Sequence, residues 1–279
     1  KYILLEKFDN YWKGWDKTNH YESILFQIAS ESSTRLQMIE SGIADYAVLI
    51  PNQLLSRLEE NPKVRVSYHQ SWANEFYLLN TKKHPTDNLW VRRAIASSLN
   101  RKTLANYIYK NTAVEPKGLI PQSIPLFIEP DSLISFDLDL AKGYLKKAEI
   151  DLSNTTIDLS YVSTYEEYRL TTFMLLDNLR KLDVQLELKP GLWSTNWDKA
   201  KVLETAPNII SMAWWPTVSS PSDWFFALYN TQQNPLFNLS YYSNSIVDSL
   251  TKKAWELESV DPESARDIYK EIQNILMKL

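Results

Sequence analysis

The chain has 279 residues, of which 44% are hydrophobic and 23% charged, so it is long enough to bury its own core. Thirty basic residues stand against thirty-four acidic ones, and the net charge of −4 argues against nucleic acid as a partner. The absence of cysteine excludes thiol nucleophiles and thiolate metal sites. Five scattered glycines exclude a dinucleotide fingerprint and a P-loop, and the three histidines lack zincin spacing. We therefore expect neither a metal nor a cofactor.

Residues 1–75 alternate short apolar runs with helical patterns, which favours an α/β layer. Strands are predicted at 1–8, 24–28, 46–50 and 64–68. Ser33 is placed to cap a helix that Gly42 can end at C′. A second helix is expected at 54–60, so the strands should be joined as βαβ units.

The same alternation continues through residues 76–214. Strands are predicted at 75–80, 156–162, 184–188 and 208–214, and helices at 88–99, 138–148, 165–182 and 194–204. Asp87 is the expected N-cap of the first of these helices. Residues 111–136 carry four prolines and are expected to form a long ordered loop.

The last helix has the clearest signals in the chain. Asp261 is the predicted N-cap, with Pro262 at N1. A core-facing apolar stripe follows, made of Ala265, Ile268, Tyr269, Ile272, Ile275, Leu276 and Leu279. Because the chain begins within a predicted strand and stops inside this stripe, we expect a fragment of a longer protein. No apolar run approaches the roughly 18 residues of a membrane span.

Five phrases along the chain carry a family resemblance. They are FDNYWKGW (8–15), SSTRLQMIESGIADYA (32–47), FYLLNTKKHPTDNLWVRRAIASSLNR (76–101), FNLSYYSNSIVDSL (237–250) and DPESARDIYKEIQNIL (261–276). In this order they resemble signatures of the extracellular solute-binding proteins, family 5, the oligopeptide- and dipeptide-type receptors of ABC importers.

The resemblance implies an α/β fold: a periplasmic-binding-protein type II-like lobe, a mixed sheet flanked by helices, with part of a second α/β lobe. Residues 1–75 would form the C-terminal part of lobe I and residues 76–279 lobe II. The full protein would be about twice as long. Two such lobes close over a solute in the cleft between them, so we expect a binding protein and not an enzyme.

The resemblance also indicates a ligand-contacting loop, AWWPTVSSPSDWF (213–225). Trp214 matches the family tryptophan, whereas Thr217 and Ser220 stand where family members carry aspartates. The first of those aspartates pairs with a peptide's α-amine, so the amine-binding carboxylate is expected to be absent. Asp223 lies further along the loop and would need a different loop path to replace it.

A second departure concerns two arginines of oligopeptide-binding members, which correspond here to Ser211 and Ala200. Without them a charged peptide would leave unpaired charges in the cleft. The remaining candidates are mostly aromatic: Trp193, Trp214, Trp215, Trp72, Asn74 and Tyr77. Their flat apolar faces suit sugar rings or bulky peptide side chains.

We therefore expect a receptor that delivers an oligopeptide-class solute to ABC permease subunits. A neutral oligosaccharide, bound in a Trp-lined cleft, remains an open alternative. A carbohydrate-active enzyme is the alternative of another class, although no acidic pair lies in a catalytic phrase. A sensor or chaperone with the same fold is a third reading. The protein is expected to be a monomer outside the cytoplasm, in the periplasm or as a cell-surface lipoprotein.

Overall fold

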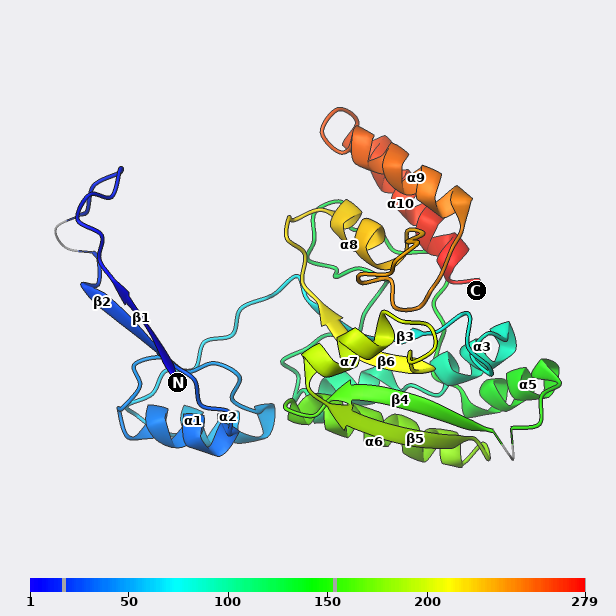
Figure 1. The fold of residues 1–279 in the computed structure, drawn as a ribbon, viewed down its shortest axis with the longest axis horizontal. Coiled ribbons are helices and arrows are strands. Elements are labelled where there is room, and N and C mark those ends of the chain that lie inside the picture. The colour runs from blue at the N-terminus through cyan, green and yellow to red at the C-terminus, as the bar shows by residue number, and fades with distance from the viewer. Residues whose placement is uncertain (17–18, 153–154, 279) are drawn as a thin grey trace. The chain divides into compact units, whose positions relative to one another are not determined.

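The computed structural model describes residues 1–16, 19–152 and 155–278. The chain forms two compact units, Lys1–Val66 and Ser67–Leu279, each visible in Figure 1. The division precedes the boundary expected after residue 75, and the assignment of the two units to lobes of a receptor stays a prediction.

The first unit holds a two-stranded antiparallel sheet and two helices. Strands β1 (Tyr2–Glu6) and β2 (Ser23–Gln27) pair with Tyr2 opposite Gln27 and Glu6 opposite Ser23. Helices α1 (Ser32–Glu40) and α2 (Asn52–Glu59) follow. Every residue of both strands is exposed, so neither face of this sheet is covered within the described residues.

Three expectations for this unit are wrong. Residues 46–50 and 64–68 form no strand, because an apolar run becomes a strand only where a neighbouring strand pairs with it. The antiparallel pairing of β1 and β2 also excludes a βαβ unit here. Helix α1 begins one residue before Ser33 and is preceded by Glu31 as N-cap, without a side-chain cap. Gly42 does lie at φ 74°, the left-handed conformation expected just beyond the helix.

The second unit is built on a four-stranded mixed sheet. Its strands are β3 (Asn74–Leu79), β6 (Ile209–Trp214), β4 (Thr156–Val162) and β5 (Gln185–Gly191), in the order β3-β6-β4-β5. Strand β3 is antiparallel to β6, whereas β4 is parallel to both β5 and β6. The carboxyl ends of three strands therefore meet the start of β3 at one edge of the sheet (Figure 1).

The predicted βαβ units are confirmed in this sheet. Helix α6 (Glu166–Arg180) connects β4 to β5, and helix α7 (Trp193–Ala200) connects β5 to β6. Strand β5 continues through Pro190, which an edge strand tolerates. Helix α7 stops before the expected residue 204, since the Thr205 hydroxyl donates to the Lys199 carbonyl at 2.8 Å and ends the helical ladder.

Apolar cores cover both faces of the sheet. On one face Leu175 and Leu179 of α6 pack with the buried residues Ile157 and Leu159 of β4. On the other face a second cluster joins the sheet to α7 and to the C-terminal helices. Its fully buried members include Ile210, Met212, Ala200, Trp224, Phe225 and Tyr269.

Seven more helices complete the second unit within its described residues. They are α3 (Leu89–Ser97), α4 (Arg101–Thr103), the π-helix η1 (Leu104–Ile108), α5 (Leu138–Ala148), α8 (Pro221–Leu228), α9 (Ser245–Leu257) and α10 (Pro262–Leu276). Of these, α3, α5 and α10 were predicted, with small shifts at their ends, whereas α4, η1, α8 and α9 were not. The N-cap of α3 is Asn88 and not Asp87, because the Asp87 amide is still bonded to the Lys83 carbonyl of the preceding turn. None of the described helices is long and apolar enough to cross a membrane.

The C-terminal helix and the proline-rich loop are confirmed as expected. Asp261 caps α10 by accepting from the Ser264 amide at 3.2 Å. The stripe residues Ala265, Tyr269 and Ile272 are fully buried, while Leu279 lies outside the described residues. Gln273 of α10 fixes the loop through the Leu119 amide and the Ile128 carbonyl, at 2.9 and 2.7 Å.

Candidate functional site

The residues predicted to bind ligand gather mainly at the carboxyl edge of the sheet. Asn74, the first residue of β3, pairs with Trp214, the last residue of β6. In sheets with parallel strands, ligands bind beyond the carboxyl ends of those strands. The register therefore puts Asn74 and Trp214 side by side at the edge where such a site forms.

Trp214 belongs to a continuous row of aromatic rings. Its indole meets Phe237 edge to face, with ring centroids 4.8 Å apart. Phe237 stacks on Trp197 at 6.0 Å, and Trp197 stacks on Trp193 at 6.3 Å. We call Trp193, Trp197, Phe237 and Trp214 the aromatic row. All four are partly buried and pack against the core cluster that joins the sheet to α7.

Asp223 lies directly beside the aromatic row. Its Oδ2 accepts a hydrogen bond from the Trp214 indole Nε1 at 3.0 Å. The loop after β6 thus turns back on itself, and the first turn of α8 returns a carboxylate to the end of the strand. Asp223 thus lies beside Trp214, while its role in ligand binding stays a prediction.

The returning loop is held by a hydrogen-bond network beneath it. Ser220 is the N-cap of α8, and its hydroxyl contacts both Ser222 and Glu258. Glu258 also accepts from the Tyr269 hydroxyl at 2.5 Å and from the Ser222 amide at 3.3 Å. Ser220 is therefore a structural cap, committed to α9 and α10. Between the two fixed ends of the loop, Trp215 is 69% exposed and Thr217 is also exposed.

Tyr77 lies on the opposite face of the sheet from the aromatic row. It pairs with Ser211 across β3 and β6, and its hydroxyl contacts the Thr172 hydroxyl of α6 at 3.1 Å. Burial raises the pKa of the Tyr77 hydroxyl. Trp72 precedes β3 and is 43% exposed. The predicted ligand-binding residues thus lie on both faces of the sheet: Asn74 and Trp214 on one face and Tyr77 on the other.

A carboxyl group that the sequence did not single out lies two residues before Tyr77. Both oxygens of Glu75 are covered, and neither has a hydrogen-bond partner in the described part of the chain. Burial, and secondarily the nearby Glu167, raise the pKa of Glu75 to about 8. A titratable group with this perturbation at a ligand edge is a candidate for function.

Sequence reasoning missed Glu75, Trp197, Phe237 and Glu258. Strand alternation was the available signal for Glu75, because it shares its face with Tyr77 at i+2. The other three sit on separate elements, and only the fold brings them to the loop after β6. The sequence carried no signal for those contacts.

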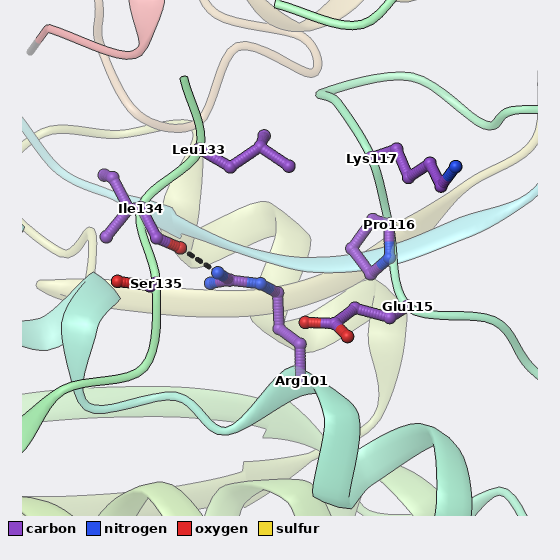
Figure 2. A pocket seen from close by; sticks show the side chains of 7 residues that line it. All are labelled: Arg101, Glu115, Pro116, Lys117, Leu133, Ile134 and Ser135. Atoms are coloured by element: carbon purple, nitrogen blue, oxygen red, sulfur yellow. Dashed lines mark hydrogen bonds between the residues drawn. The ribbon is translucent and has the colours of Figure 1, made fainter.

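Two shallow cavities lie apart from these residues. One, of about 300 Å³, is lined by Arg101, Glu115 and the proline-rich loop. Figure 2 shows the Arg101 guanidinium donating to the Ile134 carbonyl. Burial lowers the pKa of Arg101, and Glu115 opposes that effect. The Arg101 guanidinium is thus already engaged by a backbone carbonyl, and Lys117, which also lines this cavity, pairs with Glu129 at 3.1 Å.

The second cavity, of about 330 Å³, lies between β4, β5 and α7. Its carboxylate, Asp158, accepts from Lys83 and Lys189 at 3.0 and 3.1 Å and from the Asn208 amide at 2.9 Å. Burial would raise the pKa of Asp158, but these three donors outweigh it and the pKa is lowered. The Asp158 carboxylate is therefore already paired within the protein. No predicted ligand-binding residue lines either cavity.

The mixed sheet with helices on both faces has the fold of type II periplasmic binding proteins. Residues 1–235 match the model of the bacterial extracellular solute-binding proteins, family 5 Middle. The chain belongs to this family.

Its similarity to particular proteins extends over the whole chain. The glutathione-binding protein GsiB of Salmonella typhi is 25% identical over 289 residues, covering 99% of this chain and 54% of the relative. A periplasmic oligopeptide-binding protein from Borrelia burgdorferi superposes with a TM-score of 0.83 at 25% identity, covering 99% of this chain and 54% of that one. DppA from Helicobacter pylori, in complex with the peptide STSA, gives a TM-score of 0.87 at 21% identity, covering 100% and 53%. The chain spans about half the length of these relatives.

Proposed function

We propose that the whole protein is the solute-binding receptor of an ABC importer and takes up oligopeptide-class solutes. Family membership supports the receptor role, and the Borrelia and Helicobacter structures are peptide-binding proteins by their descriptions. The GsiB relatives bind glutathione, which is itself a small peptide. The receptor would work as a monomer outside the cytoplasm, in the periplasm or as a surface lipoprotein, and would pass its solute to permease subunits.

The observation that carries the peptide class is the carboxylate of Asp223 at the aromatic row. Trp214 uses Oδ2 of this carboxylate, which leaves Oδ1 to pair with a cationic group of a solute. Trp193 and Trp214, both partly buried, supply apolar surface for side chains. Asp223 thereby takes the place of the family aspartate that is absent at Thr217. On this proposal Trp215, Thr217, Asn74 and Trp72 contact the remainder of the solute.

A neutral oligosaccharide is the second candidate solute, and the aromatic row is the observation that favours it. On this alternative Trp193 and Trp214, at the two ends of the row, each take a sugar face, because the Lys201 ammonium already covers the Trp197 ring at 3.6 Å from its centroid. A carbohydrate-active enzyme would use such rings too, but it would convert its ligand on prolonged incubation. A receptor returns the ligand unchanged.

The test is a tryptophan-fluorescence titration of the full-length protein with tri- to pentapeptides and, separately, with β-linked oligosaccharides. Asp223→Asn keeps an acceptor for Trp214 and removes the charge. We expect peptide affinity to fall at least about tenfold in this variant, because a charge-assisted bond is lost. Glu256→Gln, an exposed carboxyl on α9, is the control. Saturable binding of sugars without binding of peptides would show that the solute is an oligosaccharide and not a peptide. If neither binds, the receptor proposal is rejected.

A further inference from the structure

Glu75 is the buried ionisable group for which the fold supplies no partner. It lies on β3 opposite Ala213, on the face that Tyr77 turns toward α6. Both carboxyl oxygens are covered, and no donor among the described residues reaches them. A buried carboxyl in this state is costly. Such a group in a folded protein therefore calls for a functional explanation.

The charges around Glu75 make its surroundings more negative still. The two influences on its pKa are burial and the charge of Glu167, and both disfavour the carboxylate. Arg169, two residues after Glu167 on α6, is bound to Glu166 at 2.8 Å and is not among the charges that act on Glu75. What this site lacks is a positive charge, and a solute could bring one.

A second polar group on the same face is also without a partner. Ser211 pairs with Tyr77 on the neighbouring strand and is only 1% exposed, and its hydroxyl has no hydrogen bond within the described ranges. Because opposite residues of paired strands share a face, Ser211 and Glu75 point to the same side of the sheet. Two strands thus turn unsatisfied polar atoms toward one place.

Two tyrosines lie close to the Glu75 carboxyl. Tyr168 of α6 and Tyr77 of β3 are near enough to Glu75 for its charge to raise the pKa of each hydroxyl, although burial is the larger cause for both. Tyr165 packs against Tyr168 with ring centroids 5.2 Å apart. Ring faces attract cations, and carboxylates beside them add to that attraction. Tyr77, Tyr165 and Tyr168 each keep part of their surface exposed, so the group lies near the surface.

We propose that Glu75, with Tyr77, Tyr168 and Ser211, forms a subsite for a protonated nitrogen of the solute. The chemical class is an alkylammonium group, which could come from a basic peptide side chain or from an amino sugar. This inference rests on the receptor function proposed above. It adds a cation subsite on the face of the sheet opposite the aromatic row and Asp223.

Access to the carboxyl requires only a local movement. Glu75 as a residue is partly exposed, whereas its two oxygens are not. Glu75 is the second residue of β3. On this proposal, rotation of its side chain brings the carboxyl toward the arriving ammonium group. The carboxyl then loses its proton, since the cation stabilises the charged form. Binding of a cationic solute is therefore linked to release of one proton.

The probes for this subsite are the tripeptides Ala-Lys-Ala and Ala-(Nε-acetyl-Lys)-Ala, titrated into the full-length protein. The two differ only in the side-chain charge. We expect Ala-Lys-Ala to bind at least about tenfold more tightly, as for a charge-assisted bond. Its affinity should rise more than about tenfold between pH 6 and pH 8, because the lysine stays charged while Glu75 gives up its proton. Calorimetry in two buffers near pH 7 should show release of about one proton.

Glu75→Gln is the test variant, because glutamine resembles the protonated carboxyl that the fold already holds. It should abolish the preference for Ala-Lys-Ala, the pH dependence and the proton release, while binding of the acetylated peptide is retained. Glu187→Gln, on β5 and on the opposite face of the sheet, is the matched control and should change none of these. In parallel, β-linked glucosamine and N-acetylglucosamine trisaccharides compare charged and neutral sugars near pH 7, where part of the amine is still charged and part of Glu75 can give up its proton.

The possible failures can be told apart. If peptides or sugars bind, but without a preference for the charged member of a pair, the subsite is wrong and the receptor function stands. The same holds if the preference persists in Glu75→Gln. If no peptide or sugar binds, the receptor proposal fails, and the subsite fails with it.

Discussion

Three donors converge on one oxygen of Glu258: the hydroxyls of Ser220 and Tyr269 and the amide of Ser222. Glu258→Ala removes their shared acceptor, so we expect a loss of about 2 kcal/mol in the free energy of unfolding. Urea denaturation of the full-length protein measures it. Glu256→Ala, on the same helix with only a 4.0 Å ion pair to Lys252, should stay within about 0.5 kcal/mol. Equal effects of the two substitutions would contradict the network.

The pH dependence of the free energy of unfolding tests the raised pKa of Glu75 without any ligand. The pKa of Glu75 is about 8 in the folded protein and near 4.5 when unfolded. Between these values the folded state binds one more proton, so this group makes stability fall as pH rises. The slope should approach roughly 1.4 kcal/mol per pH unit. Glu75→Gln should remove this slope. A wild-type stability with the same slope as the variant would show that Glu75 titrates normally.

At the scale of elements, the N-cap of α3 is Asn88 in the structure, whereas the sequence predicted Asp87. The Asn88 side chain accepts from the amides of Trp90 and Val91 at 2.8 and 3.4 Å. Asn88→Ala is therefore expected to destabilise the protein by about 1 kcal/mol, the usual value of an N-cap. Asp87→Ala, expected from the sequence to be the damaging change, should alter unfolding by less than about 0.5 kcal/mol. Thermal or urea unfolding of both variants measures the two losses of stability. A larger loss in Asp87→Ala than in Asn88→Ala would contradict Asn88 as the N-cap.

Elements with an internal signal could be predicted, and elements that depend on a partner could not. Helix α10 follows from Asp261, Pro262 and a regular stripe, all of which act within one segment. The runs at 46–50 and 64–68 have strand-like composition but no pairing strand in the described structure. Composition sets a preference for extended backbone. Pairing decides whether a strand forms.

At the scale of the whole molecule, the chain spans about half the length of its curated relatives. Neither face of the β1–β2 sheet is covered in the described residues, and a two-stranded sheet alone is marginally stable. On the proposed receptor function, in which the full-length protein closes two lobes over its solute, we expect the 279-residue chain to bind that solute at least about a hundredfold more weakly. Parallel titrations of both would measure this. Submicromolar affinity of the shorter chain would contradict it.

Sequence alone determined the class of fold, the βαβ order of the second unit, its C-terminal helix and the family resemblance, because each rests on spacing within a segment or on matched phrases. It also named Trp214 and Asn74 as candidate ligand-binding residues, and the structure pairs them across β3 and β6. Only the tertiary structure decided that Asp223 returns to Trp214, that Trp193, Trp197 and Phe237 continue the row, and that Tyr77 faces away from it. The reason is physical: these contacts join residues from different strands and helices, and their approach is fixed by sheet register and loop path. Glu75 belongs to the same group, because a carboxyl becomes unusual only when folding buries it without a partner.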